Sequence, residues 1–269
     1  MMRILMLVIS LAWISGMGPI ALAEDKIVIP GTGDSQELLR ALATAFERAN
    51  PGTKIEVPDT IGSSGGIRAT IEGKCDLARV ARLFNEKEKA YNLSYKVFAC
   101  SPVVFVANPS VKGVENLSFD QILALFSGKI KSWSELGGQN QKIYIAQREE
   151  GDACRIILDK DIPGWKEIKN FPGEVIYTTP DLIAAITKHE NTIGYAPLSM
   201  LRKADLKLLQ IAGVRPTVEN VKNGSYTLVV PFAFVWKGEL KGLAKIFIDY
   251  TFSPEGQRII VEYGANPVR

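Results

Sequence analysis

The chain has 269 residues, of which 46% are hydrophobic and 23% charged, and its formal net charge is +3 at pH 7. This length allows one large domain or two lobes with separate cores. Because basic and acidic residues are mixed along the chain and form no tracts, we expect no nucleic-acid partner.

The first 23 residues predict a secretory signal peptide. Arg3 is their only charged residue, and the uncharged run that follows ends in Ala21–Ala23, which fits an A-x-A cleavage site. The apolar core from Ile4 to Ile14 is shorter than the roughly 20 residues of a transmembrane helix. No cysteine lies near the cleavage point to carry a lipid. We therefore expect an exported, periplasmic protein that does not span the membrane.

From residue 26 onward, short β-branched segments alternate with amphipathic helical segments. This alternation favours an α/β architecture with parallel strands. The first helix is expected within 36–50, with its apolar side chains on one face. Asp34 and Glu37 are expected to form its capping box, and the Asn50-Pro51-Gly52 segment is expected to end it.

Two long apolar strands, near 97–107 and 226–236, bracket a second α/β series. In this series Ser118 and Gln121 can cap a helix, and Pro180 can occupy the first turn of another. Two further helices are expected after the second long strand, the last of them opened by the segment SPEG. The chain contains no tandem repeat and no low-complexity linker.

Three cysteines, Cys75, Cys100 and Cys154, are too few for a disulfide framework and have no metal-ligand spacing. The sequence does not choose among their three possible pairings. We favour buried, small apolar side chains over a redox role. No metal or cofactor is predicted, and we expect a monomer.

The segment GTGDS at 31–35 allows two interpretations, the first of which is a nucleophile. Hydrolases of the GDSL group carry their serine in a Gly-Asp-Ser turn, here Gly33 to Ser35, and need a histidine base. The sole histidine is His189, and Ile186 stands three residues before it where that group has an aspartate. A solvated position near a helix C-terminus suits His189 better.

The second interpretation is a cradle for an anion. A glycine turn at a helix start points free backbone N–H groups outward, where the helix dipole favours negative charge. Two more turns of this kind follow in the chain: one holds Gly62, Ser63, Ser64, Gly65 and Gly66 before a short helix, and the other holds Arg148 and Gly151. Several helix N-termini with hydroxyls and one arginine would form an oxyanion site.

These segments resemble the periplasmic phosphate-binding proteins of bacterial phosphate ABC transporters, and more broadly the two-lobed type II periplasmic binding proteins. The resemblance is carried, in chain order, by GTGDS, IGSSGGI, FSGKIKSWSELGG, QREEG, NTIGYAPL, RPTVENVKNGSYTL and FIDYTFSPEGQRIIVEYGANPVR. It implies one lobe from 24–103 and 228–269, a second from 104–227, and crossover strands between them. It also implies a non-enzymatic protein that captures phosphate or a similar small oxyanion for an ABC permease.

By position, the resemblance assigns Ser35 and Ser63 as hydroxyl donors and Arg148 as the cationic clamp. The chain departs from the family in two places. Gly151-Asp152-Ala153-Cys154 stands where Gly-Ser-Gly-Thr is usual. Val80-Ala81-Arg82 stands where the family commonly has an aspartate or, in related members, two serines and an arginine. The full expected ligand-binding set is Gly33, Asp34, Ser35, Ser63, Ser64, Arg82, Arg148, Gly151, Asp152, Ala153 and Cys154.

Several alternatives remain open at this point. An ionised Asp152 can accept a hydrogen bond only from a protonated ligand oxygen. Alternatively, Asp152 only caps its helix, and Arg82 pairs with it or faces solvent. At the level of function, the alternatives are a binding or sensor protein for a different small anion or zwitterion, and a GDSL-type serine hydrolase.

Overall fold

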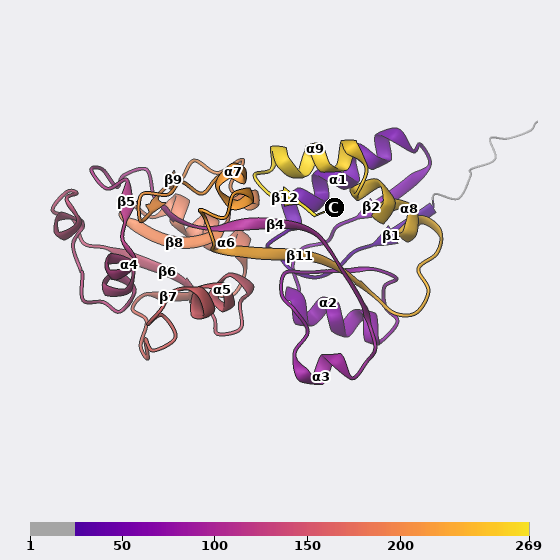
Figure 1. The fold of residues 1–269 in the computed structure, drawn as a ribbon, viewed down its shortest axis with the longest axis horizontal. Coiled ribbons are helices and arrows are strands. Elements are labelled where there is room, and N and C mark those ends of the chain that lie inside the picture. Colours follow the sequence, from indigo (N-terminus) through magenta and orange to yellow (C-terminus); the bar gives the residue numbers. More distant parts are fainter. Residues whose placement is uncertain (1–24, 269) are drawn as a thin grey trace, which may run out of the picture.

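The computed structural model describes residues 25–268, so the predicted signal peptide lies outside the described residues. Figure 1 shows two parts of the molecule side by side, with the strands β4 (Ser94–Ala107) and β11 (Val229–Trp236) running between them. The two long strands expected from the sequence are therefore confirmed.

Each part combines a few strands with covering helices. The part on the right of Figure 1 contains β1 (Asp25–Val28), α1 (Gln36–Ala49), β2 (Thr53–Glu56), α2 (Gly62–Ile71), β3 (Ala78–Val80), α3 (Glu86–Lys89), α8 (Gly242–Thr251), α9 (Pro254–Glu262) and β12 (Asn266–Pro267). The other part contains β5 (Asn116–Leu117), α4 (Phe119–Phe126), β6 (Tyr144–Arg148), α5 (Ala153–Asp161), β7 (Glu174–Ile176), α6 (Thr179–Lys188), β8 (Thr192–Pro197), β9 (Lys207–Leu208), β10 (Gln210–Ile211), α7 (Val218–Lys222) and the 3-10 turns Trp133–Leu136 and Leu198–Met200.

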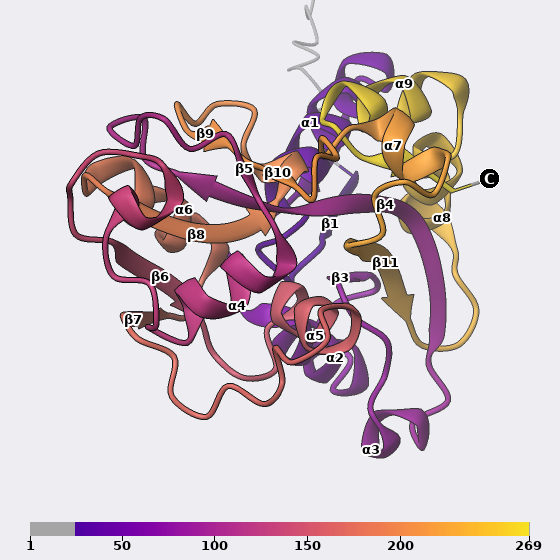
Figure 2. The ribbon, with the colours of Figure 1, turned by 60° about the vertical axis from the view of Figure 1, so that its left-hand side comes forward.

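Strand β4 joins the two parts because its two halves pair with different strands. Residues 94–102 pair with β11, whereas residues 103–107 pair with β8, both antiparallel. The resulting strand order is β3-β11-β4-β8-β6-β7, and Figure 2 shows β4 extending across the whole sheet. The α/β fold is thus confirmed.

The expected parallel pairing is confirmed for β1 with β2 and for β6 with β7 and β8. It is wrong for β3, which pairs antiparallel with β11. The two long strands β4 and β11, for which no direction is predicted, are also antiparallel. The physical reason is that the chain leaves the first part along β4 and returns along the neighbouring β11, so these strands must run in opposite directions.

Most of the predicted helix ends are confirmed. Ser118 and Gln121 form a capping box at α4, and Pro180 lies in the first turn of α6. The capping box expected at α1 is wrong. Ser35 is the N-cap residue of α1 and makes no side-chain cap bond. Asp34 instead accepts a hydrogen bond from Thr179, because the start of α6 packs against this turn.

Helix α2 begins earlier than the sequence suggests. The run from Gly62 to Gly66, expected before the helix, forms its first turns. Close packing explains why this helical turn contains a glycine at position 66: a Cβ atom there would lie 2.9 Å from the Cα of Gly31. The helix start is therefore pressed against the GTGDS turn, and a larger side chain would separate the two segments.

The three cysteines are free thiols. Cys154 is buried, and Cys75 and Cys100 are partly buried. Burial raises the pKa of all three thiols, so they stay protonated at neutral pH. This agrees with the expected packing role for the cysteine side chains.

Candidate functional site

A cavity of about 360 Å³ lies where the starts of four helices meet. Its walls come from the turn before α1, the first turn of α2, the loop between β6 and α5, and the start of α6. The lining residues are Thr32, Gly33, Asp34, Thr60, Ile61, Gly62, Ser63, Ser64, Arg82, Arg148, Glu149, Gly151, Asp152, Ala153, Tyr177, Thr178 and Thr179. Because each helix start has unpaired N–H groups and the positive end of the helix dipole, this arrangement favours an anion.

Arg148, the last residue of β6, is the main buried cation of this cavity. Its Nε and Nη2 atoms lie 3.1 and 2.9 Å from Oδ2 of Asp152, and Nη2 lies 3.5 Å from Glu149. The Nη1 atom is buried and has no hydrogen-bond partner among the described residues. One edge of the guanidinium is therefore held in place, while a donor on the other edge has no hydrogen-bond partner.

Asp152 has two structural contacts, one for each carboxylate oxygen. Its Oδ1 accepts from the backbone N–H of Arg155 at 3.0 Å, so it is the N-cap of α5, and its Oδ2 pairs with Arg148. Asp152 therefore caps α5 as one alternative expected, but it does more than cap, because it also pairs with Arg148 and lines the cavity. Of the two possibilities left open for Arg82, the pair with Asp152 is not formed: Arg82 lies 2.7 and 2.8 Å from the two carboxylate oxygens of Glu88.

Asp34 is a buried carboxyl at the junction of the two parts. Asp34 is 2% exposed, and Thr179 Oγ1 donates a hydrogen bond to the Asp34 Oδ1 atom at 2.5 Å. Burial is the largest cause that raises the pKa of Asp34, to about 7, followed by the nearby Asp152, while Arg148 and the Thr179 hydroxyl act in the opposite direction. At neutral pH this carboxyl can therefore hold or release a proton.

The serines of α2 keep their hydroxyl protons available. Ser63 Oγ accepts from the N–H of Ala81 at 3.1 Å, and Ser64 Oγ accepts from Arg82 Nη2 at 2.7 Å. Since a hydroxyl has one donor in addition to its acceptor capacity, each can still donate. Both residues line the cavity.

Two of the expected residues do not line the cavity with their side chains. Ser35 is 0% exposed, and its buried Oγ has no hydrogen-bond partner in residues 25–268. Cys154 is 2% exposed and lies in the first turn of α5. Among the remaining members of the expected set, Gly33, Arg82, Gly151 and Ala153 line the cavity.

The start of α6 contributes residues that no motif in the sequence analysis predicts. Tyr177, Thr178 and Thr179 line the cavity, and the Thr178 side chain caps α6 by accepting from the N–H of Asp181. Two threonines before a proline are a helix-start signal. That signal locates the helix but gives no indication that its start faces the glycine turns.

His189 lies at the end of α6 that is away from the cavity. It is the exposed C-cap residue of α6, whereas the start of the same helix lines the cavity. At 1.5 Å per residue, the ten residues of this helix separate its ends by about 15 Å. His189 instead lines another cavity with Tyr144 and Thr192. Ser35 therefore has no histidine base.

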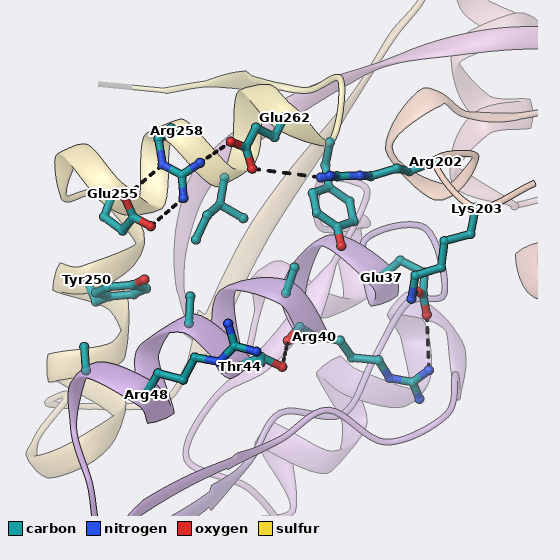
Figure 3. A pocket seen from close by; sticks show the side chains of 15 residues that line it. Glu37, Arg40, Thr44, Arg48, Arg202, Lys203, Tyr250, Glu255, Arg258 and Glu262 are labelled. Atoms are coloured by element: carbon teal, nitrogen blue, oxygen red, sulfur yellow. Dashed lines mark hydrogen bonds and ion pairs between the residues drawn. The ribbon is translucent and has the colours of Figure 1, made fainter.

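A larger groove, of about 1050 Å³, lies between α1, α9 and the segment after β8 (Figure 3). Most of its cations already have carboxylate partners: Lys203 lies 3.0 Å from Glu37, and Arg202 lies 3.9 Å from Glu262, whereas Arg48 lines the groove without an ion pair to any described residue. Arg258 also pairs with Glu262. We assign the candidate site to the smaller cavity, because its buried guanidinium still has an unpartnered donor.

Residues 20–255 match the family model of the PBP superfamily domain. The chain belongs to the PBP superfamily. It is 32% identical over 250 residues to the phosphate-binding protein PstS of Bacillus subtilis (strain 168). This match covers 91% of this chain and 82% of that protein. It is 25% identical over 253 residues to the phosphate-binding protein PstS of Borreliella burgdorferi, which covers 90% of each chain.

Solved structures of the PBP superfamily agree with this assignment. A crystal structure from Clostridium perfringens, described as a phosphate ABC transporter substrate-binding protein with bound phosphate, has a TM-score of 0.81 and 29% identity, and covers 91% of this chain and all of that chain. An ABC-type phosphate transport receptor from Vibrio cholerae shares the fold with a TM-score of 0.64. The expected type II periplasmic binding protein-like fold is confirmed. Within residues 25–268, no helix has the length and apolar character to cross a membrane.

Proposed function

We propose that the protein captures inorganic phosphate, or a closely similar small oxyanion, and delivers it to an ABC transporter. The observation that carries this proposal is the convergence of four helix starts and the unpartnered Nη1 of Arg148 on one cavity. Helix N-termini and guanidinium groups both attract anions. The phosphate-binding relatives and the phosphate-bound structure from Clostridium perfringens support phosphate as the anion.

The carboxyl groups of the cavity favour a ligand that carries a proton. Asp34, Glu149 and Asp152 all line it, and those that are ionised would repel a fully deprotonated anion. Hydrogen phosphate can share its proton with Asp34, whose pKa is about 7. Sulfate has no proton to share near neutral pH. The site should therefore prefer phosphate over sulfate.

The expected residues take different roles in this proposal. Arg148 Nη1 and the hydroxyls of Ser63 and Ser64 donate through side chains, because these groups line the cavity or have a donor available. Ser35 and Cys154 contribute through backbone N–H groups at their helix starts, since their side chains are buried. Arg82 adds positive charge from the opposite side, although Glu88 offsets it.

The two parts act as lobes that close on the ligand. We assign one lobe to 24–103 and 228–269 and the other to 104–227, with β4 and β11 as the connecting strands. The hydrogen bond from Thr179 to Asp34 joins residues of opposite lobes beside the cavity. Hinge closure of this kind removes a bound ligand from water and strengthens its hydrogen bonds.

The protein is proposed to be a non-enzymatic, exported carrier. Catalysis by Ser35 would need a base, and the sole histidine stands at the far end of α6. Export is inferred from the signal-peptide pattern of residues 1–23, which supports a periplasmic location for the mature protein.

A thermal-shift series tests the proposed function. The protein without residues 1–23 is heated with phosphate, arsenate, sulfate, molybdate or small organic acids. A ligand at 100 times its dissociation constant adds about 2.7 kcal/mol of stability, so phosphate should raise the melting temperature clearly and sulfate should not. A larger shift with an organic acid or zwitterion would favour the alternative binding protein, and ester turnover that depends on Ser35 would favour the hydrolase.

A further inference from the structure

Arg79 on β3 is a buried cation without a carboxylate partner. The residue is 0% exposed, and no ion pair of the described residues includes it. Burial is the main cause that lowers the pKa of Arg79, to about 10, so the side chain stays protonated at neutral pH. An isolated charge in the interior is strongly unfavourable unless hydrogen bonds replace its hydration. Its hydrogen-bond partners therefore indicate why the fold retains it.

The guanidinium of Arg79 spans two loops. Its Nε donates to the carbonyl of Thr32 at 2.8 Å, and its Nη1 donates to the carbonyl of Ile29, both in the segment between β1 and α1. Its Nη2 donates to the carbonyl of Pro58 at 2.7 Å, in the segment between β2 and α2. One rigid, planar group thus fixes the relative position of both segments.

The backbone of Arg79 holds the first loop as well. Its carbonyl accepts from the N–H of Thr32 at 3.1 Å, and its N–H donates to the carbonyl of Pro30 at 2.9 Å. Between them, Gly31 has φ +142°, and a Cβ atom there would lie 1.8 Å from the Arg79 carbonyl oxygen. The GTGDS turn therefore rests directly on β3, at a distance that only glycine permits.

These two loops form one side of the anion cavity, while Arg79 does not line it. The first loop supplies Thr32, Gly33 and Asp34, and the second continues into the Thr60–Ser64 segment. We propose that Arg79 is a positioning residue for anion binding, which holds both loops in their binding geometry without contacting the ligand. The inference rests on the proposed function of this cavity. It predicts that the side chain of Arg79 affects ligand affinity through the loops alone.

Two variants and a matched control test this inference. Arg79→Met keeps the length of the side chain but removes every donor, and Arg79→Lys keeps the charge but not the planar fork. Trp133→Phe is the control, because Trp133 is also buried and loses one hydrogen bond, from Nε1 to the Asn191 carbonyl, away from the cavity. Phosphate affinity is measured by calorimetry on each folded protein, together with the melting temperature without ligand.

Arg79→Met should weaken phosphate binding by about tenfold or more, the equivalent of one hydrogen bond to a charged group. Arg79→Lys should show a smaller loss. The control should lower the melting temperature with an unchanged dissociation constant. Wild-type affinity in folded Arg79→Met would overturn the inference, and if that variant does not fold, wild-type affinity in Arg79→Lys would do so.

Hydrogen exchange of the ligand-free proteins separates this inference from the proposed function. Exchange should become faster in the 29–36 and 58–66 segments of Arg79→Lys, with the rest of the chain unchanged. If the wild type binds no phosphate, the proposed function fails, and this local change alone still supports the positioning role. An increase spread over the whole chain, or none in these segments, would overturn it.

Discussion

The anion cavity and the groove between α1 and α9 contain the same types of charged residue in different surroundings. In the cavity, the side chains of Arg148 and Asp152 are 8% and 4% exposed. In the groove, the side chain of Lys203 is 77% exposed and pairs with Glu37. An exposed pair contributes about 0 to 1 kcal/mol to stability, because water and salt screen it. A buried pair loses its hydration, so removal of one partner has a far larger effect.

In this comparison, burial more than the number of ion pairs distinguishes the candidate site from the groove. In the groove, Arg202 and Lys203 are exposed to solvent and pair with the carboxylates of Glu262 and Glu37 (Figure 3). In the cavity, burial leaves one donor of Arg148 without a partner and raises the pKa of Asp34 to about 7. An unpartnered donor and a carboxyl near its titration point are both available to a ligand.

The largest effect is expected from Arg148→Ala. This change leaves Asp152 as an uncompensated buried carboxylate, so we expect the free energy of unfolding to fall by about 3 to 5 kcal/mol. Phosphate binding should be lost. Urea unfolding and calorimetry measure the two effects. The control, Arg202→Ala in the groove, should change the unfolding free energy by less than about 1 kcal/mol. Equal effects of the two changes would break the comparison.

Asp34→Asn should remove a pH dependence of stability. The pKa of Asp34 is raised from 3.8 to about 7 in the folded protein, so between these values the folded state binds a proton that the unfolded state has released. Stability therefore falls as pH rises from about 4 to 7, by at most about 4 kcal/mol. Besides burial, the neighbours that set this pKa are Asp152, Arg148, Thr179 and Glu149, all retained in the variant.

The measurement for Asp34→Asn is the difference in unfolding free energy between variant and wild type at several pH values from 4.5 to 7.5. This difference should grow in favour of the variant as pH rises. Glu37→Gln, at a partly buried carboxylate in the groove, provides the control, and its difference from wild type should stay flat over this range. Parallel curves for Asp34→Asn would show that the carboxyl is not perturbed by its surroundings.

The sequence predicts the elements of the fold well, because they depend on local signals. The Ser118 capping box, Pro180 in the first turn of α6 and the apolar face of α1 all follow from short-range rules. The antiparallel pairing of β4 with β11 does not follow in this way, because it depends on where the chain returns. Family resemblance, and not periodicity, indicates that two lobes meet there.

The site is predicted less completely, because its chemistry depends on contacts between distant segments. The glycine turns and Arg148 are visible in the sequence. The Thr179 hydroxyl on Asp34 joins residues 145 positions apart, and the pKa of Asp34 depends on burial that no short motif records. The partner of Arg82 is missed for another reason: Glu88 lies only six residues further along the chain and caps the short helix α3, which no motif in the sequence predicts.

Ser63→Ala should weaken phosphate binding by about 1 to 3 kcal/mol, because a charged acceptor loses a donor that lines the cavity. Ser35→Ala should have a smaller effect, since the Ser35 hydroxyl is buried and its proposed contribution comes from the backbone. Calorimetry on both variants compares the two hydroxyls. A larger loss for Ser35→Ala would show that its side chain reaches the ligand in the bound state.

Asp152→Ser should lower the preference for phosphate over sulfate by about tenfold, or roughly 1.4 kcal/mol. Serine keeps a hydroxyl cap for α5, but it removes the negative charge beside Arg148 and so makes the cavity more favourable for a fully deprotonated anion. Parallel titrations with phosphate and sulfate measure the ratio in wild type and variant. An unchanged ratio would mean that Asp152 acts only as a cap and a partner of Arg148.

The smallest effect is expected from Lys203→Met in the groove. The change removes the 3.0 Å ion pair with Glu37, which is exposed on the lysine side, so the unfolding free energy should fall by less than about 1 kcal/mol. This small difference should shrink further between 0.05 and 1 M salt, because the Debye length falls to about 3 Å at 1 M. In contrast, the effect of Arg148→Ala on stability should persist at high salt, since its partner is buried. Urea unfolding of both variants at the two salt concentrations makes the test. If the Arg148→Ala effect were screened as strongly as the Lys203→Met effect, water would reach both regions equally, and the distinction between cavity and groove would fail.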